Sequence, residues 1–179
     1  MSRIFIWWIG EAAADRAALE HVAARLAAAF RAPVALWEAP ERPRHAYDPR
    51  RRQHASGMIL RWLLEAGPGA GKVLGITDRD LFIPILTYVF GEAQLGGSAA
   101  VVSTARLVER ADARGGGPLL ARLEKEALHE VGHAFGLVHC GTPRCVMSRS
   151  AAVKDVDAKE PALCPECRVR LQELDVGGP

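Results

Sequence analysis

The sequence predicts an α+β domain built on a twisted, mixed five-stranded sheet with helices packed on it. Three short apolar runs alternate with two segments of helical periodicity in the N-terminal part, which gives the order strand–helix–strand–helix–strand. Two further extended runs follow, with a glycine-rich turn between them, and then a long helical segment. The 179 residues are the length of one domain, and a chain of this size can bury a core without covalent cross-links.

Each element is predicted from apolar spacing and from the residues that begin or end it. The predicted strands lie at residues 3–9, 34–37, 73–76, 85–90 and 99–104, with Gly96-Gly97-Ser98 as the turn between the last two. The predicted helices lie at residues 11–31, 54–66, 119–137 and 166–174. Residues 39–53 hold three prolines and five arginines, and this composition predicts a polar loop.

The charge balance argues against a protein that binds nucleic acid. Lys and Arg number 23 against 21 Asp and Glu, so the net charge is only +2. No apolar run reaches the roughly 18 residues of a membrane-spanning helix. The apolar run at residues 4–9 is short and Glu11 follows it closely, which favours a buried strand over a signal peptide. We therefore expect a cytoplasmic monomer that binds neither nucleic acid nor a membrane.

The segment from His129 to His139 carries the strongest functional signal, the pattern H-E-x-x-H-x-x-G-x-x-H. On a helix, His129 and His133 lie one turn apart on the same face and can bind one metal ion. Glu130 lies beside them and can reach a water at that metal without occupying it. If the helix continued, His139 would lie about 9 Å further along its axis, so the chain must reverse, and Gly136 is placed for that reversal. Three histidine ligands with an open fourth position are typical of a catalytic zinc site.

Four cysteines close to this motif predict a second metal site. Cys140, Cys145, Cys164 and Cys167 have the spacing C-x4-C, eighteen residues, then C-x2-C. Two such pairs across a loop are typical of a closed, tetrahedral zinc site with a structural role. Neighbouring side chains of an extended segment point to opposite sides, so His139 and Cys140 can bind different ions. Two alternatives remain open, a redox-active C-x-x-C pair and free buried thiols.

Taken with Met147, these residues resemble the archaemetzincin family of metzincin zinc metallopeptidases. The resemblance implies a single metzincin-like (zincin) catalytic domain over residues 1–179, with an upper subdomain at about 1–136 and a small lower one at about 137–179. It also implies two zinc ions per chain. The catalytic zinc would be held by His129, His133 and His139, with Glu130 as the general base and Met147 as the Met-turn residue beneath the histidines, and the four cysteines would hold the structural zinc.

The leading hypothesis for function is hydrolysis of a peptide or protein substrate by a water that zinc activates, with Glu130 as the base. The sequence does not decide between aminopeptidase and endopeptidase action. One alternative is an inactive zinc-binding module that binds peptides or proteins, and the intact Glu130 argues against it. Another is nucleic-acid binding by Arg42, Arg44 and residues 50–52, but such a run is more often a solvated loop.

Overall fold

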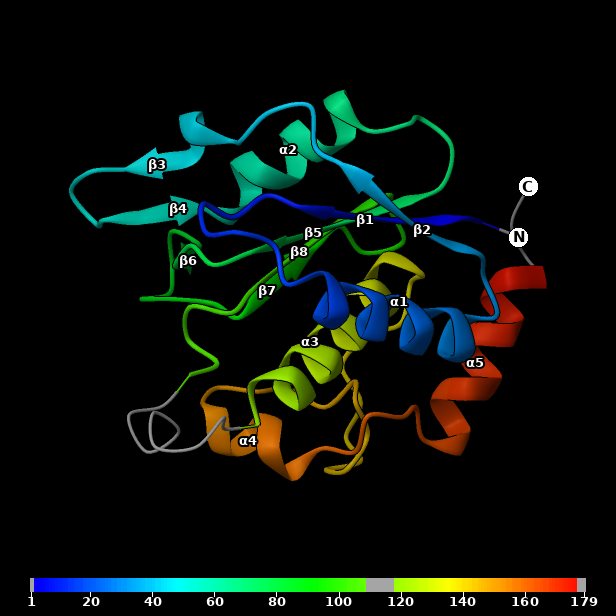
Figure 1. Cartoon of the computed structure of the whole chain (residues 1–179). Helices are drawn as coiled ribbons and strands as arrows, with labels where there is room; N and C mark the ends of the chain where they lie inside the picture. Colours follow the sequence, from blue (N-terminus) through cyan, green and yellow to red (C-terminus); the bar gives the residue numbers. More distant parts are fainter. Residues whose placement is uncertain (1, 109–117, 177–179) are drawn as a thin grey trace.

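A five-stranded sheet forms the centre of the computed structural model, which describes residues 2–108 and 118–176 (Figure 1). The strand order is β2-β1-β5-β8-β7. The first four strands pair in parallel, and β7 pairs antiparallel with β8 at one edge. The predicted mixed five-stranded sheet is thus confirmed. Its strands are β1 (Ile4–Trp8), β2 (Val34–Glu38), β5 (Lys72–Thr77), β7 (Gly91–Ala93) and β8 (Ala99–Ser103).

Helices cover both faces of this sheet (Figure 1). One face packs against α1 (Arg16–Phe30) and α3 (Leu119–Ala134), and the other packs against α2 (Ser56–Ala66). The alternation of side chains along β1 explains how one strand serves two cores. Ile4 and Ile6 belong to the core under α1 and α3, whereas Phe5 and Trp7 belong to the core under α2. The N-terminal apolar run is therefore a buried strand, as predicted.

The chain after α3 is largely irregular and packs against that helix. It includes two helices, α4 (Val153–Ala158) and α5 (Pro165–Val176), and Figure 1 places α4 on the side of α3 that faces away from the sheet. The predicted helix at 166–174 corresponds to α5, whereas α4 was not predicted. None of the helices in the described part of the chain is both long and apolar enough to cross a membrane.

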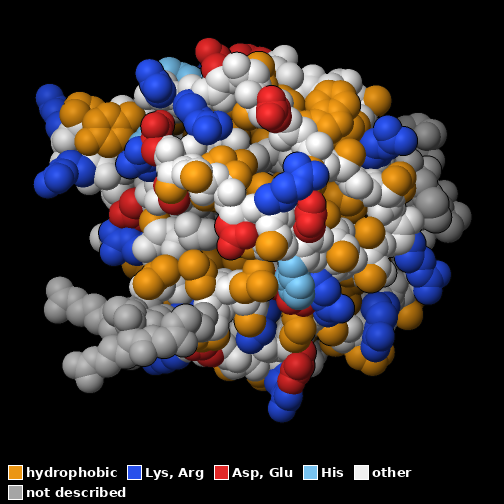
Figure 2. Space-filling model, viewed as in Figure 1, with side chains coloured by type: hydrophobic (Ala, Val, Ile, Leu, Met, Phe, Trp, Pro, Cys, Tyr) orange, Lys and Arg blue, Asp and Glu red, His pale blue; other side chains and the backbone are white. Residues whose placement is uncertain are grey.

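A second, smaller sheet corrects the predicted loop at 39–53. After a short 3-10 helix, η1 (Arg44–Ala46), the strands β3 (Tyr47–Asp48) and β4 (Gln53–Ala55) form an antiparallel pair that β6 (Leu81–Phe82) extends. The Asp48 carboxylate closes their turn by accepting the backbone N–H groups of Arg50 and Arg51. Lys and Arg side chains gather at the tip of this sheet (Figure 2). The strands could not be predicted, because hydrogen bonds to the Asp48 side chain form the turn between them and the segment has no alternating apolar pattern.

The predicted strand at 85–90 is wrong. This segment forms turns, and Ile85 is 85% exposed. The edge strand lies just beyond it, at residues 91–93, where the backbone pairs with β8. An apolar run forms a strand only where its side chains pack against another part of the protein, and the side chains of Ile85 and Leu86 are exposed instead.

Two helix boundaries differ from the prediction by three residues or more. Helix α1 begins at Arg16 rather than residue 11, because the Asp78 carboxylate accepts the backbone N–H groups of Glu11 and Ala12. Asp15 then caps the helix by accepting the backbone N–H of Ala18. Helix α3 ends at Ala134, three residues before the predicted end, and this earlier end shapes the functional site.

Candidate metal centre

The chain reverses directly after α3, as the histidine pattern requires. His129 and His133 lie one turn apart on this helix, and Gly136 adopts a φ of 99°. The His133 carbonyl accepts the N–H of Gly136 at 2.8 Å, and the Gly132 carbonyl accepts the N–H of Leu137 at 3.0 Å. A side chain at position 136 would strain this backbone conformation, which explains the glycine. The reversal brings His139 back to the other two histidines.

The three imidazoles converge with the spacing that a tetrahedral metal ion requires. One ring nitrogen from each of His129, His133 and His139 lies within 4.8 Å of the other two. The Nε2 atoms of His129 and His133 are 3.1 Å apart. Two ligands of a tetrahedral zinc ion, each about 2.0–2.1 Å from it, are separated by about 3.3 Å. The arrangement of the described histidines therefore fits one zinc ion.

Backbone carbonyls fix the orientation of two of these rings. The Nδ1–H of His129 donates to the Val146 carbonyl at 2.8 Å, and that of His133 donates to the Leu137 carbonyl at 2.7 Å. Both bonds leave the Nε2 atoms free to bind a metal, which is the tautomer that such sites use. Burial lowers the pKa of all three imidazoles, and for His129 the nearby Lys159 ammonium lowers it further. The neutral, metal-binding form of each ring is thereby favoured.

Glu130 directly follows His129 on α3, and its side chain lies against the edge strand β7. Its side chain is buried, and burial raises its pKa well above the usual value, with the nearby Glu126 acting in the same direction. On β7, Gly91 provides the space for it, because a Cβ atom at position 91 would lie 2.6 Å from the Glu130 Cγ. The carboxylate is therefore placed next to β7, the edge strand of the sheet.

Met147 is fully buried and packs against α3 between the histidines. A Cβ atom added at Gly132 would lie 2.5 Å from its Sδ, so the glycine makes room for the thioether. The Met147 carbonyl accepts the N–H of Cys140 at 2.9 Å, which ties this turn to the segment that carries His139. Met147 thus packs closely against the helix that carries His129 and His133, and it has no reactive group of its own.

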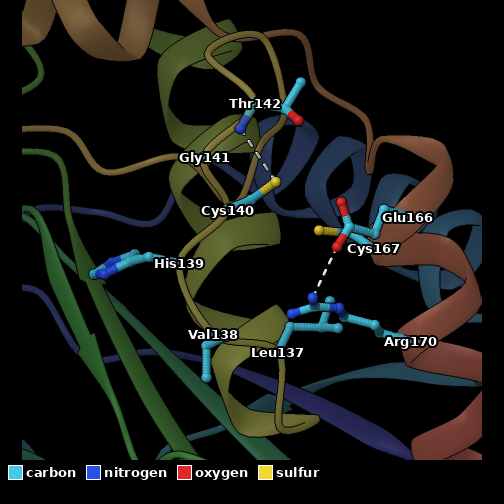
Figure 3. A pocket seen from close by; sticks show the side chains of 9 residues that line it. All are labelled: Leu137, Val138, His139, Cys140, Gly141, Thr142, Glu166, Cys167 and Arg170. Carbon is cyan, nitrogen blue, oxygen red and sulfur yellow. Dashed lines mark hydrogen bonds and ion pairs between the residues drawn. The ribbon is translucent and has the colours of Figure 1, made fainter.

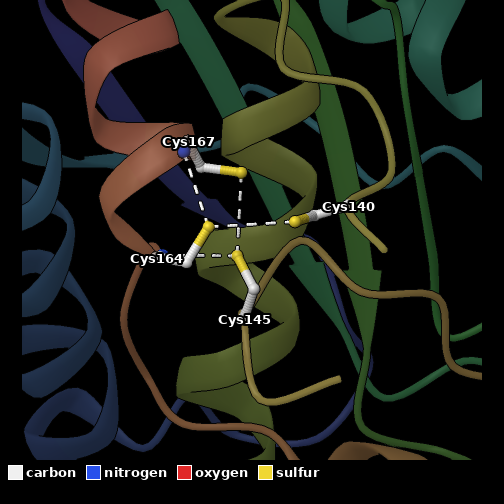
Figure 4. A group of neighbouring side chains, drawn as sticks. All are labelled: Cys140, Cys145, Cys164 and Cys167. Atoms are coloured by element: carbon white, nitrogen blue, oxygen red, sulfur yellow. Dashed lines mark hydrogen bonds between the residues drawn. The ribbon is translucent and has the colours of Figure 1, made fainter. Parts of the chain in front are cut away.

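The four cysteines form a compact cluster (Figure 4), and the first of them, Cys140, directly follows His139 in the chain. None is in a disulfide, and all four Sγ atoms lie within 4.8 Å of one another. The Sγ atoms of Cys140 and Cys164 are 3.8 Å apart, and those of Cys145 and Cys167 are 3.7 Å apart. With Zn–S bonds of about 2.3 Å, a tetrahedral site separates its sulfurs by about 3.8 Å. This geometry fits a zinc ion with four thiolate ligands.

Backbone N–H groups donate to three of the four sulfurs in this cluster. The N–H of Cys167 donates to the Cys164 Sγ at 3.5 Å and lowers the pKa of Cys164 to about 7. The N–H of Cys164 donates in turn to the Cys145 Sγ, and that of Thr142 donates to the Cys140 Sγ, each at 3.4 Å. Such N–H···S bonds favour the deprotonated sulfur that a metal requires, whereas burial raises the pKa of the Cys145 and Cys167 thiols.

A hollow of about 360 Å³ lies next to the cysteine cluster, between residues 137–142 and α5 (Figure 3). Glu166 and Arg170 of α5 form an ion pair of 2.7 Å at its wall. In Figure 3, His139 points to the opposite side of the 137–142 segment from these two residues. The hollow is therefore separate from the point at which the three imidazoles converge.

Sequence reasoning did not find a buried ion pair beneath His129. The Lys159 ammonium lies 3.1 Å from the Glu126 carboxylate and 3.5 Å from the Nδ1 of His129, and both charged side chains are almost fully buried. Glu126 lies one helical turn before Glu130, and this position on the predicted helix is the only feature of the sequence that links it to the site. No sequence signal marks Lys159, which follows α4 at the end of a segment without a motif.

Comparisons with known proteins agree with this geometry. The sequence model of peptidase family M54 matches residues 70–173. The archaemetzincin of Haloarcula marismortui is 42% identical over 140 residues, which cover 75% of this chain and 80% of that protein. The crystal structure of archaemetzincin from Methanopyrus kandleri matches with a TM-score of 0.86 at 31% identity, covering 98% of this chain and 96% of the other. For the archaemetzincin of Archaeoglobus fulgidus in complex with malonate, the TM-score is 0.80 at 36% identity, with 94% and 99% covered. The chain therefore belongs to peptidase family M54, the archaemetzincins, and is a zinc metallopeptidase.

Proposed function

We propose that this metallopeptidase hydrolyses peptide bonds at a zinc ion held by His129, His133 and His139, with Glu130 as the general base. The observation that carries the proposal is the convergence of the three imidazoles, with one ring nitrogen of each within 4.8 Å of the others. Glu130 directly follows the first of these histidines and is buried next to the edge strand. Ligands and base thus come from one helix and from the reversal that follows it.

In this mechanism Glu130 transfers the proton, and two backbone carbonyls orient the ligands of the metal. A bound zinc ion supplies Lewis acidity, which polarises the scissile carbonyl and makes a water more acidic. Glu130 accepts a proton from the attacking water and then delivers it to the leaving amine nitrogen. The Val146 and Leu137 carbonyls hold two of the imidazoles in orientation throughout. The residues of this chain therefore orient the metal ligands and transfer the proton.

The substrate is proposed to be a peptide or protein segment in extended form. Strand β7 lies at the edge of the sheet and, among the described residues, pairs with β8 alone. A peptide can add to such an edge as a further strand, using main-chain hydrogen bonds for affinity. Because Gly91 of β7 lies against Glu130, a peptide bound there would pass next to the proposed base.

We further propose that a second, structural zinc ion is bound by Cys140, Cys145, Cys164 and Cys167, so that each chain holds two. The sulfur separations of 3.7 and 3.8 Å support this assignment. The ion would cross-link residues 140–167 within the part of the chain from residue 137 onward, which we propose as a lower subdomain beside the upper one at about 1–136. Since Cys140 directly follows His139, the structural ion would also restrain a ligand of the catalytic one.

The variant Glu130→Gln tests the assignment of the base. We expect its rate of peptide cleavage to fall by about 10²–10⁴-fold, because the amide cannot accept the proton. Its zinc content, measured by mass spectrometry of the native protein, should stay unchanged, since Glu130 is not a proposed ligand. Peptide libraries supply the substrates, because the preferred sequence is unknown.

A matched control for this variant is Glu124→Gln, which changes another buried glutamate of α3. Glu124 pairs with His21 and Arg25 on α1, away from the histidine cluster, so its loss should leave cleavage nearly unchanged. Cleavage by Glu130→Gln at a rate close to that of the parent protein would refute the role of Glu130. Binding of peptides by the parent protein without any cleavage would instead indicate an interaction module.

A further inference from the structure

Lys72, the first residue of β5, bonds the β7–β8 turn to the end of helix α3. No sequence motif links these two elements. The Lys72 ammonium donates to the Gly97 carbonyl at 2.9 Å and to the Ala134 carbonyl at 2.7 Å. Gly97 belongs to the turn between β7 and β8, and Ala134 is the last residue of α3. The same ammonium lies 4.7 Å from the centre of the Phe135 ring. One side chain therefore holds the turn after the edge strand against the end of the helix that carries the histidines.

A backbone hydrogen bond runs parallel to this link. The N–H of Gly96 donates to the His133 carbonyl at 2.9 Å, and this carbonyl also accepts the N–H of Gly136. The β7–β8 turn is thus bonded to the peptide unit of a proposed zinc ligand. Gly96 and Lys72 thus each bond this turn to the C-terminal end of α3.

The positive charge of Lys72 suits its position at the C-terminal end of α3. Among the described residues no carboxylate pairs with it, and partial burial lowers its pKa. The C-terminus of a helix carries unpaired carbonyls and a partial negative charge, which stabilise a cation placed there. The face of the Phe135 ring adds a further attraction. A neutral, apolar side chain at position 72 would leave the Ala134 and Gly97 carbonyls without this donor.

We propose that Lys72 is a positioning residue that fixes the edge strand β7 relative to the catalytic helix α3. The inference rests on the proposed function, in which a peptide adds to β7 and is cleaved at the histidine cluster. The strand sets where the scissile carbonyl lies, and the helix sets where the ligands and the base lie. A misplacement of about 1 Å between the two can cost about a hundredfold in rate. Lys72 therefore acts on the rate of turnover more than on the binding of substrate.

The first test compares the kinetics of Lys72→Met, Lys72→Arg and Lys125→Met. Lys125 is a matched control, because its ammonium also donates to two backbone carbonyls, those of Val156 and Asp157 at 3.1 Å each, but next to α4. We expect Lys72→Met to lower kcat by about 10–100-fold with KM within about threefold, and Lys72→Arg to restore most of kcat. Lys125→Met should retain kcat, and all variants should retain their zinc.

The second test uses hydrogen exchange and needs no turnover. In Lys72→Met the amide of Gly96 should exchange faster than in the parent protein, whereas in Lys125→Met it should not. Unchanged exchange at Gly96, or an equal loss of kcat in the two methionine variants, would overturn the inference. If the parent protein cleaves no peptide, the proposed function fails, yet the exchange comparison still decides whether Lys72 holds the turn to the helix.

Discussion

At the scale of single residues, two glycines shape the site as much as the proposed ligands do. Gly136 permits the reversal of the chain, and the histidine pattern was sufficient to predict that role. Gly132 makes room for the Met147 sulfur. The family resemblance implied that Met147 packs beneath the histidines, but no pattern pointed to Gly132 as its partner. A pattern on one helix shows which residues share a face, whereas contact with a distant turn depends on how the chain folds back.

The variant Gly132→Ala tests this close contact. The new Cβ would lie 2.5 Å from the Met147 Sδ in a tightly packed interior, so we expect a loss of about 1–3 kcal/mol in the free energy of unfolding. Gly57→Ala on α2 is the control, because no atom lies within 4 Å of its added Cβ, and it should stabilise by up to about 1 kcal/mol. Chemical denaturation measures both changes, and equal stabilities for the two variants would contradict the packing described here.

At the scale of elements, the buried strands and the long helices were predictable, and the short elements at the rim were not. Strands β1 and β5 and helix α3 each carry an apolar pattern that matches their burial. The edge strand at residues 91–93 has no such pattern, since Gly91, Glu92 and Ala93 are weak strand formers that extend because β8 pairs with them. Pairing between distant segments thus determined the element that contacts the proposed base.

The variant Gly91→Ala tests the contact between the edge strand and Glu130. Its Cβ would lie 2.6 Å from both the Glu130 Cγ and the Val101 carbonyl oxygen, so either the carboxylate or the strand must move. We expect cleavage to fall by at least about tenfold while zinc content stays the same, because a displaced base transfers protons less efficiently. Peptide cleavage and metal analysis of the purified variant measure both effects. Full activity would show that Glu130 does not depend on this contact.

At the scale of the whole molecule, long-range contacts hold the C-terminal segment together and attach it to α3. The cysteine cluster joins the loop at 140–145 to the start of α5, and the Lys159–Glu126 ion pair joins the end of α4 to α3. The cysteine spacing predicted the cluster, whereas nothing predicted the ion pair, because a buried charge is recognisable only once its partner is placed. The sequence therefore showed the proposed ligands and not the contacts that support them.

The variant Cys164→Ala tests the contribution of the second metal site. We expect it to bind one zinc ion fewer per chain, and a loss of about 3 kcal/mol would lower the melting temperature by roughly 6–12 °C. His133→Ala is its counterpart, which should also lose one zinc ion but keep the ion of the cysteine cluster. Native mass spectrometry and thermal unfolding give both quantities, and an unchanged metal content in Cys164→Ala would rule out the cysteine site.

The most direct test is a crystal structure of the zinc-loaded protein with anomalous scattering measured at the zinc absorption edge. Two peaks per chain are expected. One should lie about 2.0–2.1 Å from a nitrogen of each of His129, His133 and His139, and the other about 2.3 Å from the four cysteine sulfurs. Absence of a peak among the three imidazoles, or a peak that only two of them contact, would contradict the proposed catalytic centre.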